Sequence, residues 1–240
     1  MPFAVRTSLI VACIAALAAL LAGCSDYSPC GPCTTVDRLH VQGKYVRVTG
    51  DPPQGVENGA RITVRWRTQT GPVVSDLEVD INDYPLEFYP SGESYMGVVP
   101  ALEPGDSLRL SVSDGSSSIS RTVPVPYAPT DVQLVGGVWD ISGPSALNRL
   151  EWSNPGVLGL AVVIQLYGFD GEDVVFIFEV ISGEPDYTDF TISNRDVPGY
   201  ADFLWIYALV AQMEYVQFPV GPGLTVLSGT IGEWPTSAGR

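Results

Sequence analysis

Short runs in which apolar and polar residues alternate recur along most of the chain. In one run Ile62, Val64 and Trp66 occupy every second position, which places them on one face of a β-strand. Asp-Gly pairs at 114–115 and 170–171 are typical of turns between paired strands. The pattern therefore predicts an all-β chain. Its strand-like runs lie at residues 60–67, 77–81, 108–112, 132–134, 150–152, 162–166, 174–181 and 224–227.

A further run at residues 203–210 is apolar on both faces. Periodicity alone does not separate a buried strand from a buried helix in so short a run. Its aromatic and β-branched residues, and the strand-rich sequence around it, favour a central strand.

Prolines divide the strand-rich region in two. Residues 123–130 read Val-Pro-Val-Pro-Tyr-Ala-Pro-Thr, and each proline disfavours helix before it and withholds a donor from a β-ladder. We therefore predict a linker at 127–130, between a first β-sandwich domain at 37–126 and a second at 131–240. Both have about the length usual for an immunoglobulin-type sandwich.

Two short motifs resemble parts of the fibronectin type III and immunoglobulin-like families. Residues 102–108, Leu-Glu-Pro-Gly-Asp-Ser-Leu, resemble the corner that leads into a core strand, although Leu108 stands where the families have a tyrosine. Residues 150–155, Leu-Glu-Trp-Ser-Asn-Pro, are similar to the second strand of fibronectin type III domains. The resemblance implies two tandem sandwiches. The antibody-type variant is excluded, because no cysteine follows Cys33 to form its buried disulfide.

The first 23 residues have the layout of an export signal. Arg6 is their only charged residue, and an unbroken apolar run covers residues 9–22. A helix of that length spans about 21 Å, which is shorter than the ~30 Å hydrocarbon core of a bilayer. The layout therefore predicts a cleaved signal peptide at 1–23 and not a permanent membrane span.

The end of this signal, Leu21-Ala22-Gly23-Cys24, resembles the lipobox of bacterial lipoproteins. The resemblance implies cleavage between Gly23 and Cys24, a diacylglyceryl group on the Cys24 thiol, and a further acyl chain such as palmitate on the new amino group. Two or more acyl chains hold a protein stably at a membrane. Ser25 replaces the aspartate of the inner-membrane retention signal, which favours the outer membrane of the bacterial envelope. An ordinary secretory signal with an incidental Cys24 is the alternative.

Composition and charge narrow the possible functions. The chain has 240 residues with 12 Lys+Arg and 27 Asp+Glu, a formal net charge of −15. A nucleic-acid partner is excluded, because an acidic surface repels phosphates. The aromatic and branched apolar content excludes disorder, and the 25 Gly and 20 Pro exclude a long coiled coil. Anionic headgroups repel such a chain, so lipid and not charge would hold it at the membrane.

A tether predicted at 24–36 contains Cys30-Gly31-Pro32-Cys33, the redox motif of thioredoxins. Catalytic thiol exchange requires the first cysteine at a helix N-terminus in a βαβ unit, and no such pattern surrounds Cys30. The preferred interpretation is a small disulfide loop formed in an oxidising envelope. An envelope thiol–disulfide protein that uses Cys30 and Cys33 is the alternative, and zinc is disfavoured because His40 is the only histidine.

The sequence contains no recognisable catalytic constellation. Every triad or Cys-His pair would have to use His40, and Lys44 is the only lysine. The acidic run at 170–173 has the carboxylates that calcium prefers, but its spacing matches no EF-hand loop. We interpret this run as a solvated turn and assign no metal ligands. The expected protein is therefore not an enzyme, and it carries no cofactor besides the covalent lipid on Cys24.

Arg61, Arg65 and Arg67 lie at even offsets, so a strand would present all three on one face. As a binding stripe they would contact an anionic glycan or the acidic patch of a protein partner. As a structural feature they would pair across the sheet with Glu78 and Asp80. We favour the structural interpretation, because acidic residues are in excess throughout the chain.

These observations favour a non-catalytic scaffold or recognition module whose protein or glycan partner is unknown. A carbohydrate-binding adhesin is a further alternative. Aromatic residues of the second domain would line a binding surface or fill the core, and the sequence does not separate the two. They are Tyr167, Tyr187, Tyr200 and Trp234.

Overall fold

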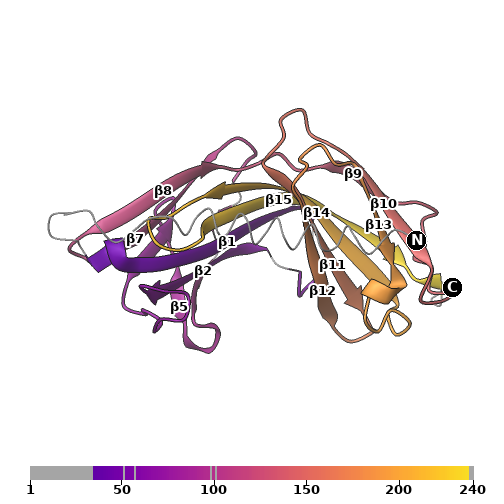
Figure 1. The fold of residues 1–240 in the computed structure, drawn as a ribbon, viewed down its shortest axis with the longest axis horizontal. Coiled ribbons are helices and arrows are strands. Elements are labelled where there is room, and N and C mark those ends of the chain that lie inside the picture. The colour runs from indigo at the N-terminus through magenta and orange to yellow at the C-terminus, as the bar shows by residue number, and fades with distance from the viewer. Residues whose placement is uncertain (1–34, 51, 57, 98, 101, 238–240) are drawn as a thin grey trace, which may run out of the picture. The chain divides into compact units, whose positions relative to one another are not determined.

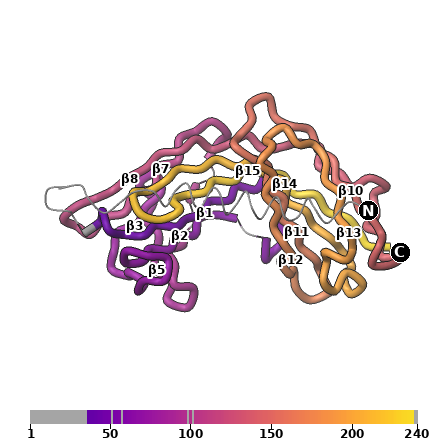
Figure 2. Tube along the Cα trace, viewed as in Figure 1, coloured from indigo at the N-terminus to yellow at the C-terminus, as the bar shows by residue number. Residues whose placement is uncertain are grey.

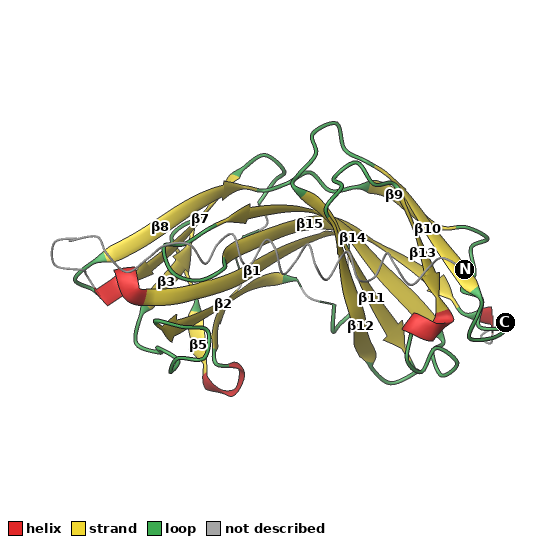
Figure 3. Cartoon of the chain, viewed as in Figure 1, coloured by secondary structure: helices red, strands yellow, loops and turns green. Residues whose placement is uncertain are grey.

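The computed structural model describes residues 35–50, 52–56, 58–97, 99–100 and 102–237, and strands dominate these ranges (Figure 3). Their helical segments are three short 3-10 turns: η1 (Thr35–Arg38), η2 (Pro90–Gly92) and η3 (Asn194–Asp196). No helix in the described ranges is long and apolar enough to cross a membrane. The predicted all-β fold class is confirmed, and the run at 203–210 is a strand.

The first half of the chain forms two sheets that face each other (Figure 1). Fully buried apolar side chains from both sheets meet between them, among them Val41, Ile62, Leu110 and Val112. One sheet contains β1 (Leu39–Thr49), β2 (Gly59–Trp66), β6 (Ser94–Gly97) and β5 (Glu87–Tyr89). The other contains β4 (Tyr84–Pro85), β3 (Glu78–Ile81), β7 (Ser107–Ser113) and β8 (Ser118–Pro124).

The second half of the chain repeats this arrangement. Its core contains Leu150, Ile164 and the fully buried Trp139, whose indole N–H donates to Asn194 Oδ1 at 3.1 Å. One sheet contains β9 (Thr130–Leu134), β10 (Leu147–Ser153) and β13 (Asp189–Ser193). The facing strands are β12 (Val174–Ser182), β11 (Ala161–Phe169), β14 (Trp205–Val216) and β15 (Gly223–Pro235).

Both sandwiches share one topology. The strand order β9-β10-β13 against β12-β11-β14-β15 repeats the order β1-β2-β6 against β4-β3-β7-β8. The predicted pair of immunoglobulin- or fibronectin-III-like sandwiches is therefore confirmed as a fold class. Between the two sandwiches, β8 ends at Pro124 and β9 begins at Thr130.

Strand β15 joins the two sandwiches into one sheet. Its residues 223–230 pair in parallel with residues 42–49 of β1, and its other edge pairs with β14. The result is an eight-stranded sheet in the order β12-β11-β14-β15-β1-β2-β6-β5, in which β1, β15 and β14 follow one another (Figure 2). Leu224 and Val226 of β15 belong to the first core, whereas Trp234 belongs to the second. The sequence predicts only a short strand at 224–227, so this dual role was missed.

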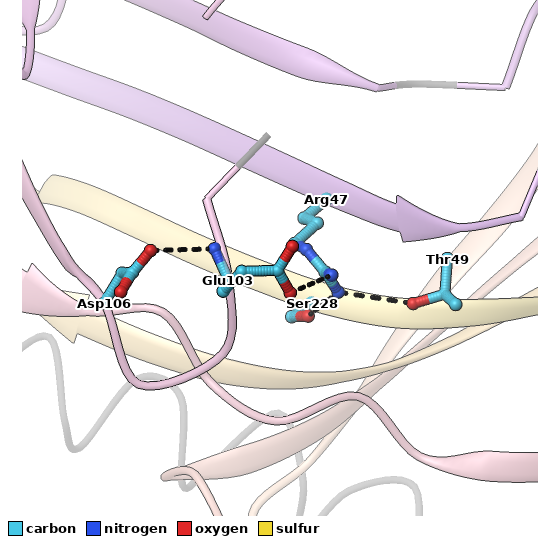
Figure 4. Close-up of polar contacts among 5 residues, drawn as sticks. All are labelled: Arg47, Thr49, Glu103, Asp106 and Ser228. Carbon is cyan, nitrogen blue, oxygen red and sulfur yellow. Dashed lines mark hydrogen bonds and ion pairs between the residues drawn. The ribbon is translucent and has the colours of Figure 1, made fainter. Parts of the chain in front are cut away.

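Arg47 fastens a loop over this junction (Figure 4). It is the register partner of Ser228 on β15, and its guanidinium contacts Ser228 Oγ at 3.5 Å and Thr49 Oγ1 at 3.3 Å. A second nitrogen lies 3.2 Å from a carboxylate oxygen of Glu103, in the loop between β6 and β7. The backbone N–H of Glu103 donates in turn to Asp106 Oδ2 at 2.9 Å. One side chain thus connects β1, β15 and the loop.

The corner at 102–108 uses a tyrosine from another strand. Leu108 is fully buried in the first core, and Tyr45 of β1, which is only 2% exposed, forms a hydrogen bond with the backbone of Leu102. Burial raises the pKa of the Tyr45 hydroxyl, although this hydrogen bond and the charge of Arg47 oppose the rise. Tyr45 of β1 therefore contacts the corner, which is also held by backbone hydrogen bonds of Gly105 and Asp106 with Val125.

A third apolar cluster lies on the outer face of the eight-stranded sheet, away from both sandwich cores. Val46 of β1 and Leu227 of β15 pack there with Val163 of β11 and Leu209 of β14. Val56, from the loop after β1, packs against them. This face therefore carries an apolar cluster beside the polar side chains of β1 and β2.

We predict that Leu224→Ala destabilises the first sandwich by about 2–5 kcal/mol, because it removes a fully buried side chain and leaves a cavity. Denaturant unfolding would measure the loss, and amide hydrogen exchange should accelerate in β2 and β7. Thr225→Ala, on the opposite face of the same strand, is the matched control and should change stability by less than about 0.5 kcal/mol. Acceleration confined to β10 and β13 would contradict the assignment of Leu224 to the first core.

Candidate functional site

The outer face of β1 and β2 concentrates positive charge. Lys44 is the direct register partner of Arg61, and His40 is the partner of Arg65. Residues directly opposite each other project to the same side of a sheet, and like charges in such pairs are destabilising. Polar Gln42 and Thr63 form the pair between them. The opposition of Lys44 and Arg61 by itself therefore lowers the stability of the folded protein.

Two adjoining hollows lie on this face, with volumes of about 520 and 740 Å³. Lys44, Arg61 and Glu179 line both, so the hollows meet at these three side chains. We call the two hollows together the groove. The smaller hollow extends along β1, β2 and β15, and the larger extends to Tyr167 and Phe176.

An ion pair crosses the groove. Nζ of Lys44, the only lysine, lies 2.8 Å from a carboxylate oxygen of Glu179 on β12. The same oxygen accepts a hydrogen bond from Gln165 Nε2 at 2.6 Å, and Gln165 Oε1 accepts one from the Tyr167 hydroxyl at 2.8 Å. Burial by itself would raise the pKa of Glu179, but the hydrogen bonds from Lys44 and Gln165 and the charge of Lys44 together hold it below its ordinary value. Glu179 is therefore ionised at neutral pH.

The two arginines of the groove differ in what holds them. Arg65 donates to the carbonyl oxygen of Gly71 at 3.1 Å and forms an ion pair with Glu93. Arg61 is exposed, and among the described residues its side chain forms no ion pair or hydrogen bond. The donors of the Arg61 guanidinium are therefore not used within the described part of the chain.

Arg67 departs from the predicted stripe. It follows the last residue of β2 with φ at +63°, and this left-handed backbone breaks the alternation of the strand. Its guanidinium lies 5.6 Å from the centroid of the Trp66 ring, a cation–π arrangement. Of the three arginines, only Arg61 and Arg65 line the groove, and their role in binding remains a prediction.

The predicted pairing of these arginines with Glu78 and Asp80 is wrong. Both acids lie on β3, which belongs to the facing sheet of the first sandwich and not to the sheet of β2. Arg65 pairs with Glu93 instead, just after η2. Residues 78 and 80 are near the arginines in sequence, but the sandwich places their strand across the core.

His40 lies at the end of the basic face. Burial lowers the pKa of its imidazole, and the charge of the opposing Arg65 lowers it further, although a hydrogen bond with its own backbone opposes these effects. His40 is therefore neutral at pH 7 and adds a polar group, not a charge, to this face.

The aromatic side of the groove was only partly predicted. Tyr167 lines it as a buried residue, but Tyr187, Tyr200 and Trp234 pack in or against the second core. Phe176, which sequence reasoning missed, is 52% exposed and lines the larger hollow. Its ring centroid lies 5.5 Å from that of Tyr167 at an interplanar angle of 72°, so the Tyr167 ring supports Phe176 in an edge-on contact.

The acidic run at 170–173 forms the turn between β11 and β12. Asp170 Oδ1 accepts hydrogen bonds from the backbone N–H groups of Asp173 at 3.0 Å and Glu172 at 2.9 Å, and these bonds lower the pKa of Asp170. Its carboxylate thus serves the turn itself. Within the described ranges, no group of three or more His, Cys, Asp or Glu side chains is arranged to hold a metal ion.

The predicted anchor and tether sites lie outside the described residues. Gly23, Cys24, Cys30 and Cys33 all precede residue 35, where the description begins. Cleavage, lipid attachment and the disulfide therefore stay predictions.

We predict that Lys44→Met lowers stability by about 1 kcal/mol at pH 7, because Glu179 loses its charged partner. Since the pKa of Glu179 in the folded protein lies below its ordinary value of 4.5, the stabilisation is complete above that value. It is lost as the pH falls through the lower folded-state pKa. Denaturant unfolding should therefore show a loss of stability at pH 7 that is absent near pH 3, where only the relief of the Lys44–Arg61 repulsion remains.

Arg109→Met is the control for this experiment. Arg109 pairs with Asp83, and both side chains are well exposed, so its loss should have almost no effect at either pH. An effect of Lys44→Met that is the same at both pH values would contradict the role of the ion pair.

No family model and no curated protein matches the chain. Among solved structures it is similar to a fibronectin type III domain of human collagen XX, with 21% identity over 44% of this chain and 95% of that chain, at a TM-score of 0.24. A two-domain fibronectin type III segment of chicken tenascin matches with 13% identity over 74% of this chain and 93% of that chain, at a TM-score of 0.29. The FN1–FN3 domains of chicken CNTN1 match with 10% identity over 79% and 65% of the two chains, at a TM-score of 0.22. The all-β fold class of this protein therefore rests on its own strands and sheets.

Proposed function

We propose that this protein is a non-catalytic recognition module of the bacterial envelope, anchored by lipid on Cys24, which captures an anionic ligand in the groove. The observation that carries the proposal is the direct opposition of Lys44 and Arg61 on one sheet face. Like charges in register cost stability. Glu179 offsets part of that cost at Lys44, and an anion bound at Arg61 would offset the rest.

The surroundings of the groove support this role. The hydrogen bond to Gly71 and the Glu93 ion pair hold Arg65, and Glu179 holds Lys44, so these cations are positioned before a ligand arrives. Positioned donors lose less conformational freedom on binding than free side chains do. Arg61, with no partner among the described residues, completes the set as the donor that a ligand would engage.

The anchor is tested by Cys24→Ser. Without the thiol no diacylglyceryl group can be attached, and an acidic chain gains nothing from anionic headgroups. We expect the variant to lose incorporation of radiolabelled palmitate and to leave the membrane fraction on sedimentation. Cys30→Ser, a few residues downstream, should keep both properties. A Cys24→Ser protein that still sediments with membranes would overturn the lipid anchor.

The groove is tested by Arg61→Glu in the full-length lipidated protein. Immobilised protein would be exposed to envelope material from cells that lack it, and binding would be followed by biolayer interferometry. We expect Arg61→Glu to reduce binding at least tenfold, because a repulsive charge replaces an attractive one. Binding of the unchanged protein should weaken as salt is added.

Arg195→Glu is the matched control for this test. It makes the same change of charge at an exposed position in η3, away from the groove. If Arg61→Glu and Arg195→Glu bind equally, the groove is not the site of capture. A thermal melt of both variants checks that each remains folded.

A further inference from the structure

We propose that the ligand of the groove is an acidic polysaccharide, a chain of sugar rings that carry carboxylates, with Arg61 contacting a carboxylate and Phe176 stacking on a ring. This inference rests on the proposed function and specifies its ligand. Three features of the groove support it: the spacing of its charges, the type of groups on its floor, and the exposed aromatic ring at one end.

The cations of the groove are spaced along a line. Arg61 and Arg65 lie four residues apart on β2, which places their Cα atoms roughly 13 Å apart. Uncharged Thr63 lies between them on the same face. Arg65 already pairs with Glu93, so the carboxylate of a ligand would engage Arg61. The neutral polar groups that flank such a carboxylate in a sugar chain would then lie over Thr63 and Gln42.

The floor of the groove presents side chains to a ligand, and the backbone N–H and C=O groups of β1 beneath them are already paired. β1 pairs with β15 on one edge and with β2 on the other, so its backbone groups are already used. An extended peptide usually binds by adding a strand to a free sheet edge, and on this floor its own amides would find no such partner. Sugar hydroxyls need side-chain donors and acceptors instead, which the lining supplies as amides and hydroxyls. These are Gln42, Asn58, Thr63, Gln69 and Thr225.

Phe176 gives the groove an apolar platform. Its ring is half exposed, and the edge-on contact with buried Tyr167 fixes its orientation. An exposed aromatic ring beside polar groups suits a ligand whose own surface alternates between apolar C–H faces and hydroxyls. A sugar ring has this character, whereas an acidic peptide would place charged side chains over the same ring.

The position of Glu179 determines which cation would bind the carboxylate of the ligand. It lies where the two hollows meet and is already paired with Lys44. A second carboxylate at Lys44 would approach Glu179 and be repelled. The ligand carboxylate is therefore directed to Arg61, on the neighbouring strand, where the guanidinium can donate two parallel hydrogen bonds.

Calorimetric titration of the full chain tests this inference with defined probes. Oligogalacturonate and oligomannuronate are chains of sugar acids, methyl-esterified oligogalacturonate keeps the rings without the charges, and poly-L-glutamate keeps the charges without the rings. We expect binding of at least one free acid. The ester and poly-L-glutamate should each bind at least tenfold more weakly than that acid, and salt should weaken the binding of the acid.

Variants assign the contacts. Arg61→Gln should weaken the binding of the free acid at least tenfold and leave the binding of the ester unchanged, because it removes only the contact with the carboxylate. Phe176→Ala should weaken the binding of the acid and of the ester by similar factors, because both probes retain the sugar ring. Arg195→Gln and Tyr84→Ala are controls of the same types, an exposed arginine and an exposed tyrosine outside the groove, and should change neither.

Several outcomes would overturn the inference. Failure of both acidic oligomers to bind, or equal binding of poly-L-glutamate, would exclude an acidic polysaccharide, and the second result would indicate an acidic polypeptide. Equal binding of the ester would exclude recognition of the carboxylate. If the oligomers fail while Arg61→Glu still abolishes capture of envelope material, the proposed function stands and only the ligand is wrong. If Arg61→Glu has no effect on capture either, both fail.

Discussion

The parallel hydrogen bonding between β1 and β15 is the constraint on which the rest of this structure depends. It pairs eight residues of each strand, from Gln42 with Gly223 to Thr49 with Thr230. Through it, residues near the C-terminus complete the core of the first sandwich, and the sheets of the two sandwiches become one. The same pairing places β1 in one sheet with β12, so that Lys44 reaches Glu179 although 135 positions separate them in sequence. Without this junction, β11 and β12 would not lie in one sheet with β1 and β2. The groove would then lack the side chains that those two strands contribute, among them Tyr167, Phe176 and Glu179.

The sequence predicts the strands but not this junction, and the reason is physical. Alternation of apolar and polar residues is a local property, so it identifies β2 and β7 directly from their residues. Pairing between strands that are distant in sequence leaves no periodic signal. One trace is Gly43, in the middle of β1, where a Cβ atom would lie 2.5 Å from Ile62 Cδ1 and 3.0 Å from Leu224 Cδ1. A glycine inside a strand marks such a close approach, but it does not say which residue approaches.

The candidate site was predictable to the extent that β2 is regular. Even spacing correctly places Arg61 and Arg65 on one face and fails at Arg67, where the backbone turns left-handed. Phe176 was missed because β12 contains a bulge. Phe178 is the partner of Leu166 and Phe176 that of Tyr167, so Ile177 is the extra residue. Two phenylalanines that strict alternation would put on one face are therefore separated, with Phe178 packed against the second core and Phe176 in the groove.

The acidic character of the chain has a more specific meaning once the cations are located. Arg47, Arg109 and Arg149 each pair with carboxylates at the surface, and such pairs leave little net positive potential. Lys44 and Arg65 are paired too, with Glu179 and Glu93, but they lie on one face of one sheet with Arg61, which forms no ion pair among the described residues. Under the proposed function, the surplus of acids would repel an anionic ligand over the rest of the surface, and Arg61 would attract it in the groove. Specificity of this kind requires repulsion elsewhere as well as attraction at the site, and a net charge of −15 around a local cluster of cations supplies both.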